Sequence, residues 1–347
     1  MSKQTKKRYR AGVIGGGAIA QACHLPGYAR HKSVELAAVA DPAKARHDEI
    51  KEQYPGVQVY TDYKELLARE ALDVVSVCTP NHLHADAAVR SLQAGCHVLC
   101  EKPMATTLKD ADRMIAAARE ARRKLMVGFT HRLMKGPIES KELLRQKAIG
   151  KPYMMRVRFA HGGPWPGWAK DKWFYDPKKA SGGAMLDMGI HAIDLCQWLM
   201  GPIARVQAKA ATLAKKIEVD DTALLIVEFK NGMLGYIEAG WTSKPGFVGF
   251  EIYGLEGSLI CDYNRTLTLC GGTASAGKDS SMDWTTIDKN PAKGGWDIEI
   301  DHWMAVVEGR EKLTMDGRAG RDALAVALAA YESSDTGKAV RPALSSP

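Results

Sequence analysis

The sequence predicts an α/β protein in which an N-terminal domain has a doubly wound parallel sheet and a second α/β domain has a large, mostly antiparallel open sheet. Three observations support this class. The first 130 residues alternate short apolar runs with helical patterns. Alternating and β-branched segments dominate afterwards. The length of 347 residues also exceeds one typical core, so we expect domains at 1–130 and 131–347.

The apolar runs of the first domain are predicted strands. They are rich in Val, Ile, Leu, Ala and Cys and carry almost no charge, which suits strands covered on both faces of a parallel sheet. Segments with helical spacing and a charged face lie between them. The predicted strands are 11–14, 35–40, 73–78, 96–100 and 125–129, and the predicted helices are 18–30, 43–53, 62–69, 83–93 and 107–122.

The second domain is predicted to be mainly antiparallel because Asn231-Gly232 suits a hairpin turn between two of its strand-like segments. Helical patterns interrupt and follow these segments. A stretch rich in Gly, Ser and Ala at 271–281 indicates a loop tip. The predicted strands are 152–162, 203–212, 220–230, 232–241, 247–253 and 257–261, and the predicted helices lie near 183–200, 297–308 and 317–334.

Composition excludes several classes of protein. With 46% hydrophobic and 25% charged residues, the chain has ample apolar surface to fold. The net charge of +8 is partly in the first ten residues and otherwise dispersed, so we expect no nucleic-acid partner, although an anionic ligand is favoured. Seven cysteines without a C-x-x-C pair indicate reduced thiols and a cytoplasmic protein. We expect no signal peptide and no membrane partner, because no apolar run is long enough.

A glycine-rich turn follows the first predicted strand. Residues 15–20, Gly-Gly-Gly-Ala-Ile-Ala, fit the pattern G-x-G-x-x-G/A, which brings the backbone close to a pyrophosphate at a helix N-terminus. Asp41 ends the second strand, where an acid binds ribose hydroxyls and repels a 2′-phosphate. We therefore expect NAD, with NADP possible because Lys44 and Arg46 lie nearby. A plain turn with a helix-capping Asp41 is the alternative. The expected cofactor-binding residues of this turn are Gly15, Gly17, Ala18, Ile19 and Ala20.

Polar residues follow every predicted strand of the first domain. In open α/β sheets, ligands bind outside the carboxyl ends of the strands, so this series indicates one binding crevice. His82 and His84 could line the same crevice or simply begin a helix. The residues at the strand ends are Gly15, Asp41, Thr79-Pro80-Asn81, Glu101-Lys102-Pro103 and Thr130-His131-Arg132.

Asp187, His191 and Asp194 form a polar stripe on an otherwise apolar helix. At 100° per residue they fall within roughly 60° of arc. A buried carboxylate needs a partner, and an Asp beside a His is an arrangement for general acid/base chemistry. A structural Asp–His bond in the core is the alternative. We expect no metal, because no H-E-x-x-H or cysteine–histidine ligand spacing occurs. Trp173 precedes this helix and could stack on a sugar ring or pack in the core.

Several motifs together resemble the glucose–fructose oxidoreductase / inositol dehydrogenase / rhizopine-catabolism (Gfo/Idh/MocA) family of NAD(P)-dependent oxidoreductases. The resemblance covers nearly the whole chain. The combination of E-K-P with D-x-x-x-H at this separation is its most specific part. The motifs are G-G-G-A-I-A at 15–20, T-P-N-H-L-H at 79–84, E-K-P at 101–103, S-G-G-A-M-L-D-M-G-I-H-A-I-D-L at 181–195 and E-I-Y-G-L-E-G-S-L at 251–259.

The resemblance implies a Rossmann domain followed by a domain whose open sheet forms homo-oligomers, dimers or tetramers. It implies hydride transfer between a nicotinamide cofactor and a hydroxyl or keto carbon of a sugar, a cyclitol or a sugar derivative. An NAD-dependent glycoside hydrolase and a non-catalytic NAD(H)-sensing protein are the alternatives.

The resemblance also implies roles for particular residues. Lys102, Asp187 and His191 would be the catalytic set, with His191 as general acid/base and the substrate hydroxyl held between Lys102 and His191. His131 or Arg132 would reach the substrate, and Trp173 and Asp194 are further substrate candidates. The residues implied to line the nicotinamide and ribose side of the cofactor are Thr79, Asn81, His84, Glu101 and Lys102.

Overall fold

The computed structural model describes residues 8–167, 169, 172–271 and 283–346. The predicted loop tip at 271–281 therefore lies almost wholly outside the described residues. The chain divides into two compact units. The first comprises Met1–Gly128, Trp168–Lys170 and Trp296–Arg321, and the second comprises Phe129–Gly167, Asp171–Gly295 and Asp322–Pro347.

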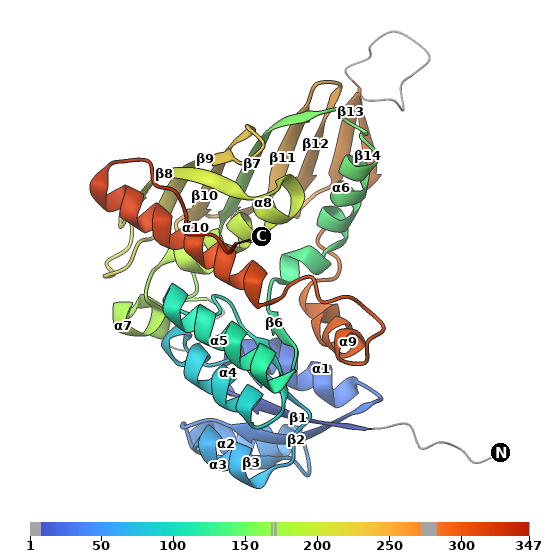
Figure 1. Ribbon diagram of the computed structural model, residues 1–347, viewed down its shortest axis with the longest axis vertical. Helices are drawn as coiled ribbons and strands as arrows, with labels where there is room; N and C mark the ends of the chain where they lie inside the picture. Colours follow the sequence, from blue (N-terminus) through green and yellow to red (C-terminus); the bar gives the residue numbers. More distant parts are fainter. Residues whose placement is uncertain (1–7, 168, 170–171, 272–282, 347) are drawn as a thin grey trace, which may run out of the picture. The chain divides into compact units, whose positions relative to one another are not determined.

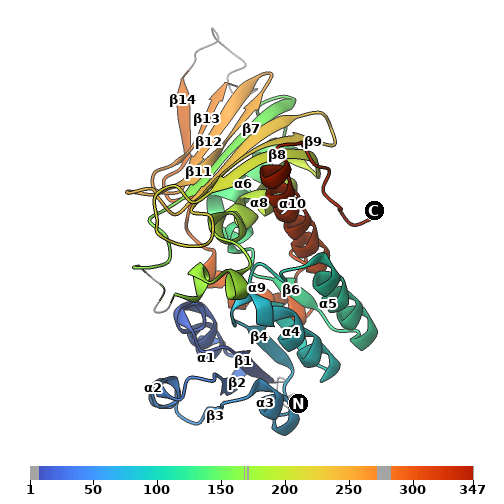
Figure 2. The same cartoon turned by 90° about the vertical axis from the view of Figure 1, so that its left-hand side faces the viewer.

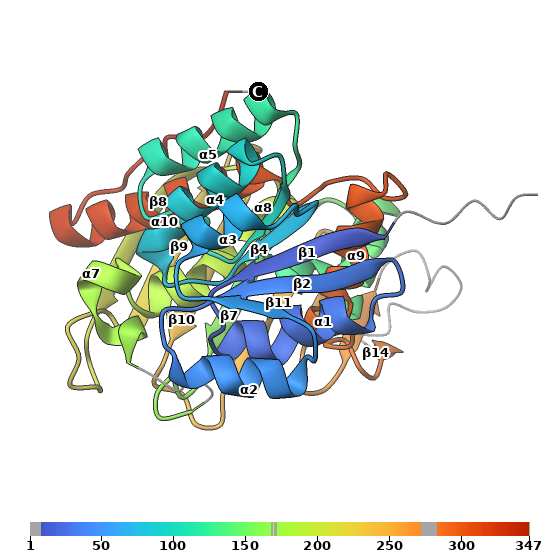
Figure 3. The same cartoon turned by 90° about the horizontal axis from the view of Figure 1, so that it is seen from below.

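The first unit contains a six-stranded parallel sheet in the order β3-β2-β1-β4-β5-β6. Helices cover both faces of this sheet, with α1 and α2 on one side and α3, α4 and α5 on the other (Figure 3). The predicted doubly wound fold is confirmed. Its strands are β1 (Tyr9–Ile14), β2 (Val34–Ala40), β3 (Gln58–Tyr60), β4 (Val74–Val77), β5 (His97–Cys100) and β6 (Leu125–Val127).

The helices of the first unit lie close to their predicted ranges. One difference is in the first helix, which opens with a π-helical turn, η1 (Ala20–His24), before α1 (Leu25–Arg30). The others are α2 (Ala45–Gln53), α3 (Tyr63–Arg69), the 3-10 turn η2 (Asn81–Leu83), α4 (His84–Gln93) and α5 (Leu108–Ala121).

Helix α9 (Trp296–Val307) returns to the first unit after the second sheet is complete, whereas the sequence alone assigns it to the second domain. It packs on α1 and η1. The contact is close, because a Cβ at Gly27 would lie 2.5 Å from Cγ1 of Ile300. The absence of a side chain at Gly27 of α1 therefore leaves the space that Ile300 of α9 occupies.

The second unit contains an eight-stranded sheet in the order β14-β13-β12-β11-β7-β10-β9-β8. Neighbouring strands are antiparallel except β7 and β10, so the predicted mostly antiparallel sheet is confirmed. The strands are β7 (Pro152–Ala160), β8 (Ile203–Ala211), β9 (Thr222–Phe229), β10 (Leu234–Gly240), β11 (Phe247–Gly254), β12 (Gly257–Asp262), β13 (Leu267–Gly271) and β14 (Trp284–Asp288).

Helices cover one face of this sheet, as Figures 1 and 2 show for α6, α8 and α10. Helix α6 was not predicted, because Gly136-Pro137 resembles a turn although proline is well tolerated in the first turn of a helix. The helical segments are the 3-10 turn η3 (Thr130–Leu133), α6 (Lys135–Arg145), the 3-10 turn η4 (Trp173–Tyr175), α7 (Pro177–Ala180), the π-helical turn η5 (Met185–Gly189), α8 (Ile190–Met200) and α10 (Gly317–Thr336).

Candidate active site

The glycine turn after β1 has the geometry that a dinucleotide needs. Gly15 has φ +95°, and a Cβ there would lie 2.6 Å from the carbonyl oxygen of Cys78, so only glycine fits. At Gly17 no atom lies within 4 Å of the position that a Cβ would take. The turn is thus packed against the end of β4 at Gly15 and open at Gly17, directly before the first helix begins. This edge fits a pyrophosphate.

Asp41 is buried and holds the same turn. Its Oδ2 accepts the N–H of Gly16 at 2.8 Å, and its Oδ1 accepts the N–H of Ala43 at 2.8 Å. Arg46 forms an ion pair with it, with Nη1 3.0 Å from Oδ2. The residue expected to bind ribose is therefore also the anchor that fixes the glycine turn.

His84 lies between the end of β4 and the E-K-P turn. Its Nδ1 and Nε2 each lie 2.7 Å from a carbonyl oxygen, that of Pro103 and that of Thr79 respectively. Burial lowers the pKa of His84, although these two carbonyl groups oppose the decrease. Asn81 is buried beside it in η2. His84 thus connects the two loops that carry the other expected cofactor residues.

Glu101 follows β5 and is buried. Its Oε1 accepts a hydrogen bond from Nε2 of His24 at 3.0 Å, and its Oε2 accepts the backbone N–H of Lys102 at 3.2 Å. Burial alone would raise the pKa of Glu101, but the hydrogen bond and positive charge of His24 lower it below its usual value. The carboxylate therefore fixes the backbone at Lys102.

In the second unit, Asp187 and His191 are buried, 7% and 4% exposed, in two different kinds of helix. Asp187 lies in the π-helical turn η5 and His191 in α8. The predicted spacing of 100° per residue over the whole stripe is therefore wrong, because a π turn advances less per residue. Oδ2 of Asp187 accepts the indole N–H of Trp241 at 3.1 Å.

Asp220 and Gly183 fix the start of this helix. The carboxylate of Asp220 accepts the backbone N–H groups of Gly183 and Met185, each at 2.8 Å, in the manner of an N-cap. The carbonyl oxygen of Asp220 would lie 1.8 Å from a Cβ at position 183, which explains the glycine. A Cβ at Gly189 would lie 3.1 Å from Sδ of Met185 and 3.3 Å from Cβ of Ala239 in β10.

The rings of His131 and Phe129 lie beside His191. The ring of His131 lies 4.5 Å from that of His191 between centroids, and Phe129 lies at 6.2 Å. His131 also packs on Phe159 at 4.7 Å and stacks on Tyr263 at 5.5 Å. The predicted residues His131 and His191 are thus together in a group of rings.

Arg132 and Asp194 form a buried ion pair with each other. Nε of Arg132 donates to Oδ2 of Asp194 at 2.7 Å, and Nη2 donates to Oδ1 at 2.5 Å. The guanidinium also lies 5.9 Å from the ring centroid of Phe129 and 5.7 Å from that of Trp198. The two side chains satisfy much of each other's charge and hydrogen bonding.

Four ring residues of this group were not found from the sequence. Trp241 directly follows β10, and Tyr263 directly follows β12. Phe129 and Phe159 read as ordinary apolar positions. The available signal was their position, since Trp241 is the last residue of the predicted strand 232–241 and Tyr263 comes two residues after the predicted strand 257–261. Only the fold brings these two rings to Asp187 and His131. Trp173 is half-buried in η4 and stacks on Phe174, with centroids 3.8 Å apart.

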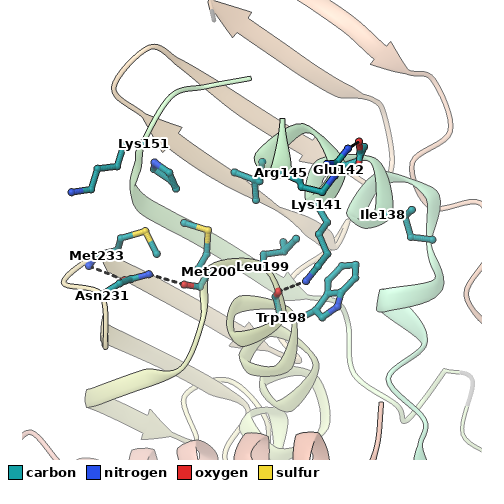
Figure 4. A pocket seen from close by; sticks show the side chains of 12 residues that line it. Ile138, Lys141, Glu142, Arg145, Lys151, Trp198, Leu199, Met200, Asn231 and Met233 are labelled. Atoms are coloured by element: carbon teal, nitrogen blue, oxygen red, sulfur yellow. Dashed lines mark hydrogen bonds and ion pairs between the residues drawn. The ribbon is translucent and has the colours of Figure 1, made fainter. Parts of the chain in front are cut away.

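A separate pocket of about 700 Å³ lies in the second unit between α6, the end of α8 and the Asn231 turn (Figure 4). Nζ of Lys141 lies 4.1 Å from the ring centroid of Trp198 and donates to the carbonyl oxygen of Trp198 at 2.6 Å. Burial lowers the pKa of Lys141. None of the predicted site residues lines this pocket. The lining residues are Ile138, Lys141, Glu142, Leu144, Arg145, Lys151, Pro152, Trp198, Leu199, Met200, Asn231 and Met233.

The order of the parallel strands and the glycine turn define the first unit as a dinucleotide-binding domain. Residues 9–129 match the oxidoreductase family with an NAD-binding Rossmann fold, and residues 138–260 match the GFO/IDH/MocA C-terminal domain. The chain belongs to this family of oxidoreductases, and its first unit is an NAD-binding Rossmann domain. Among the described residues, no helix is both long and apolar enough to cross a bilayer.

Similar proteins act on sugars and cyclitols. The chain is 28% identical to myo-inositol 2-dehydrogenase of Thermotoga maritima over 96% of its length and 98% of that protein. It is 26% identical to D-glucoside 3-dehydrogenase of Escherichia coli over 98% of its own length and 99% of that protein. The structure is also similar to that of the WlbA dehydrogenase of Bordetella pertussis in complex with NADH and UDP-GlcNAcA. The TM-score is 0.84 and the sequence identity is 26%, and the match covers 99% of this chain and 100% of the WlbA chain.

Proposed function

We propose that this chain transfers a hydride between NAD and a hydroxyl-bearing carbon of a sugar, a cyclitol or a sugar derivative. The observation that carries the proposal is the contact between the buried His131 and His191, with the buried Asp187 four residues before His191, in a chain that belongs to an NAD-binding oxidoreductase family. The substrate class follows the relatives, whose names give inositol and glucoside as substrates.

The roles of the residues follow from their chemistry. Bound NAD supplies the hydride acceptor or donor. His191 takes the proton of the substrate hydroxyl when the carbon is oxidised and returns it in the reverse direction. Asp187, held by the indole N–H of Trp241, stabilises the imidazolium of His191. Lys102 stabilises negative charge that develops on the substrate oxygen.

Substrate-contact roles remain proposals for four side chains. We assign His131 to the substrate because it packs directly on His191. Trp173 would stack on the sugar ring, since its own ring is half-buried. For Arg132 and Asp194, their mutual ion pair supports a bracing role around η3 and α8 in addition to any substrate contact.

On the cofactor side, we propose that Gly15, Gly17 and the start of the first helix hold the pyrophosphate. The residues from Thr79 to His84, with Glu101 and Lys102, would bind the ribose and nicotinamide side. Asp41 supports NAD over NADP, because its carboxylate would repel a 2′-phosphate. Arg46 reduces that repulsion by pairing with Asp41.

A spectrophotometric screen tests the function. The wild-type chain with NAD or NADP is offered inositols, aldoses, uronates and glycosides, and NADH formation is recorded. His191→Asn should lower turnover by roughly 10²–10⁴-fold, the usual contribution of a general base, with little change in NAD affinity. His31→Asn, outside the proposed machinery, serves as the control. Undiminished turnover in His191→Asn would refute the assignment.

We also propose that the open sheet forms a homo-oligomer. Leu224 and Ile226 of β9 lie on its exposed face with Leu234 and Tyr236 of β10, and the register places Tyr236 opposite Ile226. Ile226 is 64% exposed, which is unusual for such a side chain within a strand. A second copy would remove this apolar patch from water. The seven free thiols support a reducing compartment such as the cytoplasm.

A further inference from the structure

The first unit contains a buried polar cluster that includes a residue from α9. His24 of η1 hydrogen-bonds Glu101 through Nε2 and Ser76 through Nδ1, at 3.0 Å each, and Tyr28 contacts the same Ser76 oxygen at 2.9 Å. Glu299 of α9 completes the group, with its Oε2 3.9 Å from Nε2 of His24. Glu299 is fully buried.

The two carboxyl groups of this cluster lie side by side. A Cβ at Gly128 would be 3.3 Å from Oε2 of Glu101 and 3.3 Å from Oε1 of Glu299, so one backbone position touches both. Their hydrogen bonding differs. Glu101 accepts two hydrogen bonds, whereas neither oxygen of Glu299 has a hydrogen-bond partner in the part of the chain that the structure describes. A charged Glu299 would therefore be buried without a hydrogen bond, and the nearby His24 is already bonded to Glu101, which favours the neutral acid form of Glu299.

The charges that face Glu299 do not accommodate a second anion. From η1 it faces Cys23 and His24, from α1 Tyr28, and from the ends of β4 and β5 Cys78 and Glu101. Burial raises the pKa of both thiols and of Tyr28, so these groups are neutral. Burial opposes a charge on His24, but the hydrogen bond between Nε2 of His24 and the carboxylate of Glu101 raises the pKa of His24 above its usual value. The positive charge of His24 and the negative charge of Glu101 thus already balance each other.

We propose that Glu299 is a positioning residue that acts as a neutral acid beside the His24–Glu101 ion pair and so holds the Glu101–Lys102 turn in place. This inference rests on the proposed role of Lys102. The chain of contacts is short, because the carboxylate held by His24 is the one that accepts the N–H of Lys102. If Glu299 loses its proton, it competes for His24 and repels Glu101, and the turn at Lys102 loosens. Burial raises the pKa of Glu299 to about 8, so this change belongs to mildly alkaline solution.

Amide hydrogen exchange at Lys102 tests the inference without any substrate. It is measured by mass spectrometry on the full chain with bound NAD, from about pH 6.5 to about pH 9.5, and corrected for the intrinsic pH dependence. Three proteins are compared: the wild type, Glu299→Gln, which mimics the neutral acid, and Glu120→Gln, which changes an exposed glutamate of the same unit. In the wild type and in Glu120→Gln, protection at Lys102 should fall roughly tenfold above pH 8, and in Glu299→Gln it should stay constant.

An equal loss of protection in all three proteins would overturn the inference. A transition metal bound at one equivalent in the wild type and lost in Glu299→Gln would also overturn it, because the metal would then balance the charges. If the substrate screen succeeds, kcat of the wild type should decline above pH 8 while that of Glu299→Gln does not, with KM for NAD unchanged in both. A failed screen with the expected exchange pattern counts against the proposed activity but supports the positioning of the Lys102 turn by Glu299.

Discussion

The buried Arg132–Asp194 pair makes a quantitative prediction about stability. The two side chains are 8% and 3% exposed and share two parallel hydrogen bonds. Asp194→Asn removes the negative charge and leaves the guanidinium buried without its counter-ion. Breaking one partner of such a pair costs about 3–5 kcal/mol, which lowers the melting temperature of a unit of this size by about 10 °C.

Urea unfolding followed by circular dichroism measures this change as a shift of the midpoint at constant slope. The pair between Glu142 and Arg145 is the matched control, because it has the same two-bond geometry but both side chains are exposed. Glu142→Gln should leave the midpoint where it is. The double variant Arg132→Met with Asp194→Leu should recover most of the loss, because no charge is then left buried. An Asp194→Asn midpoint equal to that of the wild type would refute this reasoning.

Four further outcomes are expected. Asp41→Ala should weaken NAD binding roughly tenfold and NADPH binding less, because it removes the carboxylate expected to bind the ribose and the hydrogen bond that holds the glycine turn. Fluorescence titration with both cofactors measures this, and an unchanged ratio of the two dissociation constants contradicts it. Gly183→Ala should destabilise the second unit by at least about 2 kcal/mol in urea, because its Cβ would overlap the carbonyl of Asp220; a wild-type midpoint contradicts this. Burial raises the pKa of Glu299 to about 8, so the folded chain keeps a proton that the unfolded chain loses near pH 4.5, and the free energy of unfolding falls as pH rises between these values. Glu299→Gln should remove this part of the dependence of stability on pH, as measured by urea unfolding at several pH values. An identical pH dependence in the wild type and the variant contradicts it. If the proposed homo-oligomer forms through the open sheet, Ile226→Lys should convert it to a smaller species in size-exclusion chromatography, and an unchanged elution volume argues against this sheet face.

The sequence predicted strands and helices best where each segment has one clear period or an unbroken apolar run. All five predicted strands of the first domain are present, because parallel strands buried on both faces need such runs. The short strands β3, β13 and β14 were missed. Gln58–Tyr60 has only three residues, and four of the five residues of Trp284–Asp288 are exposed at the sheet edge, so neither carries a strong apolar signal.

The site was harder to predict than the fold, because its contacts join distant segments. Nothing near Asp187 in the sequence indicates that Trp241 donates a hydrogen bond to it. The π-helical turn that carries Asp187 has no compositional signature either, since it depends on how the backbone hydrogen bonds are spaced. The glycine turn and Asp41, in contrast, were found from the sequence because the whole motif lies within one strand–helix–strand unit.

The position of α9 in the chain has a consequence for synthesis and truncation. During translation, the nucleotide-binding unit must wait for its last helix until the entire second sheet has been made. Until then, the surface that receives Ile300, Trp303 and Met304 stays open to water, and His24 and Glu101 lack Glu299 beside them. A fragment that stops at residue 128 is therefore an incomplete unit, and a shortened protein meant to bind NAD would have to include residues 296–321.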